Sequence, residues 1–422
     1  MNASGHFAET TLGNLLSFSN GRSSPERADG LPFPVYGSNG VIGYASEANA
    51  DAGSLIIGRV GSYCGSLYLS KQQCWVTDNA IRATARGDND SRFLFYLLST
   101  LNLNNWRSGS GQPLLNQDIL SRVPALAPTP AEQRAIAHIL GTLDDKIELN
   151  RRMNETLEAM ARALFKSWFV DFDPVRAKAA SRPSLARGPR LDPIGEAEGK
   201  NPGLPKPLAD LFPDSFEDSE LGEIPKGWEV RGLDEIARFL NGLALQKYPP
   251  KDGRSLPVIK IAQLRAGNTA GADVASAELD PDYVVEVGDV LVSWSGSLEC
   301  VLWTGGRGAL NQHLFKVTSA EFPKWFYYLW VHQHLADFRH IAAGKATTMG
   351  HIQRHHLNDA KIVVPGTGTL QAASSSLSPL VQRVITTRIE SRTLATLRDA
   401  LLPMLISGEL RLKDTEEMTE EI

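Results

Sequence analysis

The two halves of this chain repeat each other, and this repetition limits its possible folds more than any other feature. The segment LGNLLSFSNG (12–21) matches LDEIARFLNG (233–242), with leucine, phenylalanine, asparagine and glycine at corresponding places. AGSLIIGRVGS (52–62) likewise aligns with VGDVLVSWSGS (287–297). The spacing between copies is far too long for a solenoid repeat, so it indicates the duplication of a whole domain.

The later parts of each half also correspond. An aromatic helical stretch, a loop of small residues and a long helical segment follow in the same order, and a short apolar strand ending in proline stands before the long helix. The pairs are FLFYLL (93–98) with WFYYLW (325–330), SGSGQPLLNQ (108–117) with AAGKATTMGH (342–351), and TLEAMARALF (156–165) with TLATLRDALL (393–402). Each half therefore predicts a mixed α/β unit followed by a long helix, with pseudo-two-fold symmetry. Symmetric DNA readers use that geometry, although duplication for enlargement or scaffolding would explain the repetition equally well.

Both long helical segments carry a heptad seam. In the first copy it comprises Ile136, Leu140, Leu143, Ile147, Asn150, Asn154, Leu157, Ala161, Leu164 and Trp168. In the second it comprises Leu377, Leu380, Val384, Thr387, Ser391, Leu394, Arg398, Leu401 and Leu405. Alternating steps of three and four predict two coiled-coil helices of roughly 28–40 residues, about 40–60 Å long, which pair antiparallel as a rigid rod. The alternative is a pair of ordinary core helices.

Several residues interrupt these seams. Asn150 and Asn154 are polar in the middle of the first seam, where such residues can fix register at some cost in stability. Gly141 and Pro379 align near each other, so both helices are expected to restart at that place. Arg398 makes the second seam more polar and leaves the length of the pairing open.

The predicted fold class is α+β: two similar mixed α/β domains joined by two long antiparallel coiled-coil helices. Residues 173–220 are rich in proline, glycine and mixed charge, which is typical of an extended linker. The expected divisions are 1–127 for the first α/β domain, 128–172 for the central helix, 173–220 for the linker, 221–366 for the second α/β domain, 367–412 for the C-terminal helix and 413–422 for a flexible tail.

The charge balance argues against a strong unaided grip on DNA. The chain of 422 residues has a formal net charge of −5, and basic and acidic residues are equal in number in each of the segments 1–125 and 221–365. DNA-binding chains usually carry a basic excess, so we expect a partner to supply much of the phosphate affinity, or basic residues to gather on one face.

The chain lacks the motifs of the enzymes that handle nucleotides or DNA. GKAT (344–347) lacks the other elements of a phosphate loop, and neither GxGxxG after a strand nor HExxH occurs. DPV (173–175) and NPGL (201–204) fall short of an amino-methyltransferase tetrapeptide. We therefore expect no catalytic residues and no cofactor.

The cysteines and histidines are not spaced as metal ligands. Cys64, Cys74 and Cys300 form no CxxC pair, and His332 and His334 are two apart on a predicted helix, so they do not face one another. We expect no metal site. No apolar run is long enough for a bilayer and the N-terminus does not resemble a signal peptide, which predicts a cytoplasmic protein without membrane contact.

Polar side chains in matching loops of both halves are the candidates for reading base edges, because Gln and Asn can pair with adenine and Arg or Lys with guanine. They could equally be solvated loop residues or phosphate contacts. The first-half candidates are Arg59, Ser110, Gln112 and Asn116. The second-half candidates are Asn311, Gln312, His313, Lys345, Thr347, Thr348, His351, Gln353 and Arg354.

Long motifs across nearly the whole chain resemble the specificity subunits of type I restriction–modification systems. They are FPVYGSNGVIGYA (33–45), IIGRVGSYCGSLYL (56–69), ALFKSWFVDFDPVRAK (163–178), SELGEIPKGWEV (219–230), GALNQHLFKV (308–317), TTMGHIQRHHL (347–357) and TLATLRDALLPMLISGEL (393–410). The resemblance implies that each domain reads one half of a split double-stranded DNA target and that the helices set the spacing.

It also implies that modification (methyltransferase) subunits dock on the helices and methylate adenine, and that a separate restriction subunit translocates and cleaves DNA. The expected partner-binding helix residues are Leu143, Ile147, Asn150, Asn154, Leu157, Leu164, Val384, Leu394 and Leu401. Three alternatives remain at this point: a coiled-coil scaffold without DNA recognition, a self-contained enzyme, and the specificity module of a related restriction system.

Overall fold

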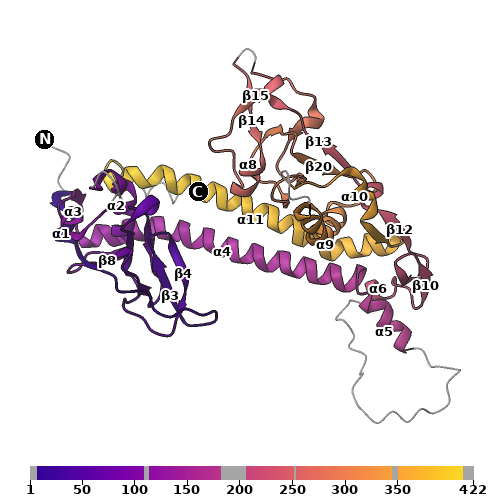
Figure 1. The fold of residues 1–422 in the computed structure, drawn as a ribbon, viewed down its shortest axis with the longest axis horizontal. Coiled ribbons are helices and arrows are strands. Elements are labelled where there is room, and N and C mark those ends of the chain that lie inside the picture. The colour runs from indigo at the N-terminus through magenta and orange to yellow at the C-terminus, as the bar shows by residue number, and fades with distance from the viewer. Residues whose placement is uncertain (1–6, 109–113, 182–205, 251–252, 345–349, 412–422) are drawn as a thin grey trace, which may run out of the picture. The chain divides into compact units, whose positions relative to one another are not determined.

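The computed structural model describes residues 7–108, 114–181, 206–250, 253–344 and 350–411. The chain forms two compact units, one of Met1–Leu149 with Ser391–Ile422 and the other of Asn150–Glu390. Each unit thus contains one globular part and a segment of each of the two long helices, α4 (Pro130–Phe169) and α11 (Thr367–Ser407) (Figure 1).

The first unit is built on an antiparallel sheet with strand order β2–β8–β5–β6. These strands are Leu16–Asn20, Ala80–Ala85, Leu55–Gly58 and Leu67–Leu69. A smaller sheet has the order β4–β3–β7 (Gly40–Ala45, Phe33–Gly37 and Trp75–Val76), and β1 (Ala8–Thr11) pairs with β9 (Pro124–Ala127). The short helices are α1 (Leu12–Leu15), α2 (Ser91–Thr100) and α3 (Gln117–Ser121).

The second unit repeats this plan. Its main sheet has the order β13–β20–β17–β18, with strands Arg238–Asn241, Leu314–Thr318, Val290–Ser293 and Cys300–Leu302. Its smaller sheet has the order β15–β14–β19–β16 (Val274–Ser276, Ser255–Ile259, Gly308–Leu310 and Val284–Val285), and β12 (Glu229–Gly232) pairs with β21 (Lys361–Val364). The helices are α7 (Leu233–Ile236), α8 (Ile261–Ala266), α9 (Lys324–Ala343) and α10 (Arg354–Asp359). The sequence duplication is therefore a duplication of strand order.

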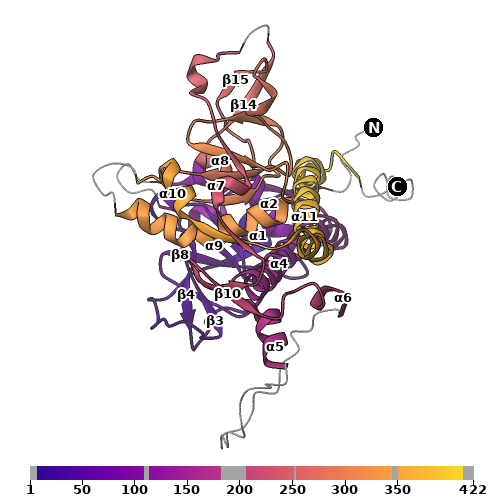
Figure 2. The same ribbon diagram turned by 90° about the vertical axis from the view of Figure 1, so that its right-hand side faces the viewer.

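Within each unit the segments of α4 and α11 pack against each other (Figures 1 and 2). In the second unit Asn150 Nδ2 donates to Glu390 Oε2 at 3.0 Å, while Asn154, one turn further along α4, meets Thr387, nearly one turn back along α11. The pairing is therefore antiparallel. None of the predicted seam residues of either helix is exposed, because the seam forms the contact between the helices and with the globular parts.

Neither helix restarts near Gly141 or Pro379: α4 and α11 each run through these positions without a break. A glycine is needed at position 141 for a different reason, which is the space taken by the Arg92 side chain. The Arg92 side chain crosses α4 there, and its Nη2 donates to the Gly141 carbonyl at 2.8 Å. A Cβ at this position would lie 2.5 Å from Arg92 Cζ, so the glycine makes room for the guanidinium.

The polar seam residue Arg398 is paired across the helices. Its Nη1 lies 2.6 Å from Asp144 Oδ1, and the same carboxylate accepts a hydrogen bond from the Tyr96 hydroxyl at 2.5 Å. Because the half-buried charge of Arg398 is paired with Asp144, it is tolerated between the helices, and the helix contact continues past this position.

The segment 173–220, expected to be an extended linker, is partly folded. It contains α5 (Asp173–Ser181), α6 (Lys206–Ala209) and β10 (Phe216–Ser219), which pairs with β11 (Gly222–Pro225). The reason is its apolar content: Phe212 packs against Trp168, and Phe216 against Phe172, at the buried aromatic core of the second unit.

Candidate nucleic-acid interface

Three loops meet at one end of the main sheet in the second unit. They are the turn after β17, the turn before β20 and the segment before α10. Trp294 N donates to His313 O at 3.3 Å, Ile352 N donates to Trp294 O at 3.0 Å, and Gly296 N donates to Gly350 O at 2.9 Å. These backbone bonds fix the loops as one surface, here called the second reader surface (residues 294–298, 311–313 and 350–354).

Trp294 forms the centre of this surface. Its ring nitrogen donates to Asn241 Oδ1 at 2.8 Å and to Gln312 O at 3.0 Å. Its ring lies 5.7 Å from the His313 ring and 6.3 Å from the His351 ring, measured between centroids. The half-buried indole therefore packs against one histidine from each of two separate loops.

The first unit contains the equivalent arrangement. Arg59 N donates to Asn79 O at 3.0 Å, Leu115 N donates to Arg59 O at 3.1 Å, and Val60 pairs with Leu114 in an isolated bridge. These contacts match those of Trp294 with His313 and Ile352, and the bridge between Ser295 and His351. We call residues 59–63, 77–79 and 114–117 the first reader surface.

A close backbone approach explains the Asn-Gly pair found in both copies of the repeat. A Cβ at Gly21 would lie 2.0 Å from Thr77 O, and one at Gly242 would lie 2.2 Å from Asn311 O. Only glycine lets the strand end pass the reader loop at this distance. The repeat thus preserves a contact between segments far apart in the chain.

Basic and aromatic side chains belong to the first reader surface or to the segment that leads to it. Arg59 reaches back to Asp78, with Nη1 3.4 Å from its backbone oxygen, and its Nε has no hydrogen-bond partner among the described residues. Burial raises the pKa of the thiol of Cys64, the residue after the loop, and a backbone hydrogen bond with Leu115 and the charge of Arg107 oppose that rise. Tyr63 is 57% exposed and Trp106 39%. Such groups can contact phosphates and stack on sugars or bases.

The structure places the predicted reading residues in different settings. Gln353 and Arg354 are exposed, while Arg59, Gln312, His313 and His351 are half-buried. The Asn116 side chain caps α3 by accepting from Ile119 N at 2.8 Å. Ser110, Gln112, Lys345, Thr347 and Thr348 lie outside the described residues.

Asn311 is buried, which differs from the prediction of a base-reading side chain. It is 5% exposed and its Oδ1 accepts from His313 N at 3.2 Å. In this conformation it shapes the loop and does not extend from the surface. Alignment of the two repeats identifies two residues that the sequence prediction missed. Asp78 and Asn79 occupy the positions equivalent to Gln312 and His313, and Asp78 and Asn79 are both exposed.

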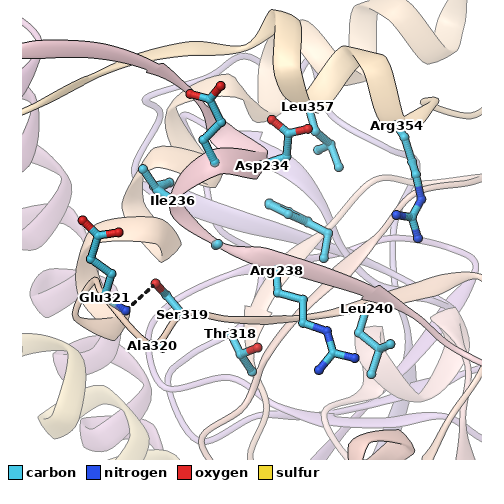
Figure 3. A pocket seen from close by; sticks show the side chains of 13 residues that line it. Asp234, Ile236, Arg238, Leu240, Thr318, Ser319, Ala320, Glu321, Arg354 and Leu357 are labelled. Carbon is cyan, nitrogen blue, oxygen red and sulfur yellow. Dashed lines mark hydrogen bonds between the residues drawn. The ribbon is translucent and has the colours of Figure 1, made fainter.

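A cavity of about 920 Å³ lies beside the second reader surface. Figure 3 shows the guanidinium groups of Arg238 and Arg354 on one side of it and the Glu321 carboxylate on the other. In the first unit the residue equivalent to Arg354 is Gln117, whose amide lies against the edge of β2, 3.3 Å from Phe18 O and 3.0 Å from Asn20 N. The two reader surfaces therefore differ along this edge.

The histidines expected not to bind metal lie apart from the reader surfaces. His332 and His334 sit on α9, where burial lowers the pKa of both imidazoles, that of His332 to about 4. Among the residues that the structure describes, no three His, Cys, Asp or Glu side chains gather as metal ligands. In the same described part, no helix has the length and apolar character needed to cross a membrane.

A family model described as the type I restriction modification DNA specificity domain matches residues 6–159 and 225–394. The match covers most of the chain and both of its repeats. The chain belongs to this family of type I specificity subunits.

Individual relatives agree with this assignment. The "Type I restriction enzyme HindI specificity subunit" of Haemophilus influenzae is 28% identical over 346 residues, which cover 72% of this chain and 72% of that protein. The "Type I restriction enzyme EcoprrI specificity subunit" of Escherichia coli is 33% identical over 112 residues, 26% of this chain and 28% of that protein. The family membership confirms the resemblance seen in the sequence.

The fold is also that of a solved structure. The S subunit of the type I restriction–modification system from M. genitalium superposes with a TM-score of 0.61 at 14% identity, covering 96% of this chain and 97% of that one. This likeness confirms the predicted α+β fold class. Family membership also makes this specificity subunit a non-catalytic one, as the missing motifs led us to expect.

The helices of this specificity subunit expose apolar residues that the sequence prediction did not name. Among the predicted partner-binding residues, Asn150, Asn154 and Val384 are buried between the helices, so they cannot meet another chain directly. The others named, Leu143, Ile147, Leu157, Leu164, Leu394 and Leu401, are half-buried. By contrast Leu149 is 58% exposed, Met160 48% and Leu397 46%.

Proposed function

We propose that this chain is the subunit that reads a split double-stranded DNA target for a type I restriction–modification enzyme. It directs adenine methylation by modification subunits and cleavage by a restriction subunit. The observation that carries the proposal is the pair of reader surfaces, built from the same three loops in the two copies of one domain. A protein with this role meets its DNA and its partners in the cytoplasm.

Within this proposal each reader surface contacts one half of the target. Arg59, Asn116, Asp78 and Asn79 serve the first half. Gln312, His313, His351, Gln353 and Arg354 serve the second, and the neighbouring Ser110, Gln112, Lys345, Thr347 and Thr348 remain candidates for base or phosphate contacts. Asn311 holds its loop in place.

The modification subunits are proposed to dock on α4 and α11. Leu149 and Leu397 are exposed in the first unit, one on each helix, and Met160 of α4 is exposed in the second unit. Exposed leucines and methionines on a helix are typical contact residues, and the half-buried seam residues beside them add apolar area. This assignment concerns the exposed faces, because the buried seam is already occupied by the partner helix.

The test is co-expression with the cognate modification subunit, followed by single-molecule sequencing of host DNA for N6-methyladenine. We expect a split motif that appears only with this chain. Exchange of residues 1–125 for those of a relative should change one half of the motif and leave the other half and the spacing unchanged. Methylation that persists unchanged without this chain, with an active modification subunit, would refute the proposal.

Docking is tested by Leu149→Glu combined with Leu397→Glu. We expect the purified variant to keep its melting temperature and to lose co-purification of the modification subunit. Thr142→Glu and Thr396→Glu are the matched controls, because both threonines are exposed and lie on the same helices. Equal loss in the control would mean that charge alone, and not the leucines, governs the contact.

A further inference from the structure

A chain of three side chains crosses the second reader surface. Ser295 Oγ lies 3.0 Å from His313 Nδ1, and His313 Nε2 lies 3.3 Å from Gln312 Nε2. Ser295 is buried, whereas His313 and Gln312 are half-buried, so the chain runs from the interior of the domain to its surface.

The donor and acceptor roles follow from the orientation of the Gln312 amide, whose nitrogen faces His313. The amide nitrogen of Gln312 can only donate, so His313 Nε2 must accept. A neutral imidazole that accepts at Nε2 carries its proton on Nδ1, and this N–H donates to Ser295 Oγ. The contact consumes one of the two amide hydrogens of Gln312. The other hydrogen and the oxygen Oε1 remain available.

The backbone of Gln312 is held on both sides. Its N–H donates to Leu243 O at 2.9 Å, and its carbonyl accepts from the Trp294 ring nitrogen at 3.0 Å. The His313 ring itself packs against the Trp294 ring. A reading side chain held in this way loses little conformational entropy on binding, which favours discrimination between bases.

We propose, on the basis of the function proposed above, that Gln312 reads an adenine in the second half of the target and that His313 and Ser295 orient its amide for this. Adenine presents an N6–H₂ donor and an N7 acceptor in the major groove, which match Oε1 and the remaining N–H of Gln312. The reversed amide would use its oxygen on the histidine and offer only donors to the DNA. His313 is thus a positioning residue, which holds the Gln312 amide so that it offers the DNA one acceptor and one donor, the pair that adenine matches.

The first reader surface lacks this arrangement. Val60, Asp78 and Asn79 stand at the places of Ser295, Gln312 and His313. The carboxylate of Asp78 is an acceptor only, and such a group fits the N4–H₂ donor of cytosine. The same position therefore distinguishes the two halves of the target.

The test uses the complex with the modification subunit and the N6-methyladenine motif as readout. Gln312→Glu should abolish the preference for adenine at one position of the second half, with at least about a tenfold fall in methylation of the original motif. His313→Leu should relax that same position to accept other bases while the remaining positions stay defined. Gln333→Glu, the same substitution at an exposed position of α9 outside both reader surfaces, is the matched control and should leave the motif unchanged.

The outcomes separate this inference from the proposed function. If the unmodified complex produces no split motif, the proposed function itself fails. A split motif whose second half is the same with Gln312→Glu overturns only the assignment of Gln312. If Gln312→Glu changes the base preference at the adenine position but His313→Leu gives the same motif as the unmodified complex, the orienting role of His313 is overturned. In each case, continued methylation of a motif whose first half and other second-half bases are unchanged shows that the variant is folded.

Discussion

At the scale of single residues, two glycines decide how the reader surfaces are built. Gly21 and Gly242 lie at the ends of β2 and β13, where the backbone passes Thr77 and Asn311 at a distance that excludes a side chain. The carbonyls that they approach belong to the loops that carry Asp78 and Gln312. A methyl group at either glycine would push directly on a reader loop.

We expect Gly242→Ala to destabilise the second unit by about 1–3 kcal/mol, because the obstructing atoms are backbone and cannot rotate away. The motif should lose definition in its second half only. The measurement is the urea midpoint together with the methylation motif. Gly366→Ala is the control, since nothing lies within 4 Å of a Cβ there. An unchanged midpoint and motif with Gly242→Ala would show that the loop yields at little cost.

His332 gives the second unit a dependence on pH. It lies on α9 against Tyr328, with a centroid distance of 4.6 Å, and its Nε2 has no hydrogen-bond partner among the described residues. Burial, with smaller contributions from Arg162, Arg339 and Arg388, lowers its pKa from 6.5 to about 4. The unfolded chain therefore binds more protons than the folded chain between these two values.

The contribution of His332 to the free energy of unfolding should therefore be fully present above pH 6.5. It should fall as the pH drops towards 4, by up to about 3 kcal/mol. His332→Phe removes the titration, so its urea midpoint should fall less between pH 7 and pH 5 than that of the unmodified protein. His340→Phe, at an exposed position of the same helix, should behave like the unmodified protein. An equal loss with His332→Phe would assign the acid sensitivity to other groups.

At the scale of elements, the helix pair contains polar groups that bond to one another across the seam. Thr387 donates to Asn154 Oδ1, and Asn150 donates to Glu390. Arg388 adds an ion pair to Glu158 at 2.5 Å. Each contact is made only in one alignment of the helices, so these residues favour a single register over the slips that a purely apolar seam would allow.

Substitution of the Asn154 and Thr387 pair should be non-additive. Thr387→Val leaves Asn154 Oδ1 without that buried donor and should cost about 1–3 kcal/mol, while Thr387→Val combined with Asn154→Leu should recover part of the loss. A double-mutant cycle from urea unfolding measures the coupling. Thr386→Val serves as the control, because this exposed hydroxyl bonds to the Gln382 carbonyl of its own helix. Additive losses would mean that the two residues do not stabilise each other.

At the scale of the whole molecule, the net charge of −5 sets the limit on DNA affinity. Many basic groups are already paired with carboxylates, as Arg231 is with Glu229 and Arg254 with Glu278. Basic and acidic residues are also equal in number in each recognition segment, so neither segment carries a basic excess to neutralise phosphates. We therefore expect the modification subunits to supply much of the affinity of the assembled enzyme for DNA.

The salt dependence of DNA binding tests this. For the chain alone we expect a slope of log K against log salt no steeper than about −3, equivalent to about three phosphate contacts. Addition of the modification subunit should steepen the slope and raise the affinity. The measurement is fluorescence anisotropy with a target duplex across a salt series. A steep slope for the chain alone would show that its own basic residues form a sufficient phosphate-binding face.

The sequence by itself determined the duplicated domain, the two long helices and their seams, because these follow from local periodicity and from the alignment of the chain with itself. It also carried the family motifs. Tertiary structure decided what no local pattern contains. It buried Asn311, used Asn116 as a helix cap, folded parts of 173–220 onto the aromatic core and kept α4 continuous through Gly141.

The chain from Ser295 through His313 to Gln312 was decided in the same way. Its first member follows β17 and the other two precede β20, and only the pairing of these strands and the packing around Trp294 bring the three together. Such contacts depend on which segments distant in sequence become neighbours, and on the hydrogen bonds that buried polar groups must then satisfy. These requirements arise only in the folded chain, so a list of polar loop residues could not distinguish Gln312 from Asn311.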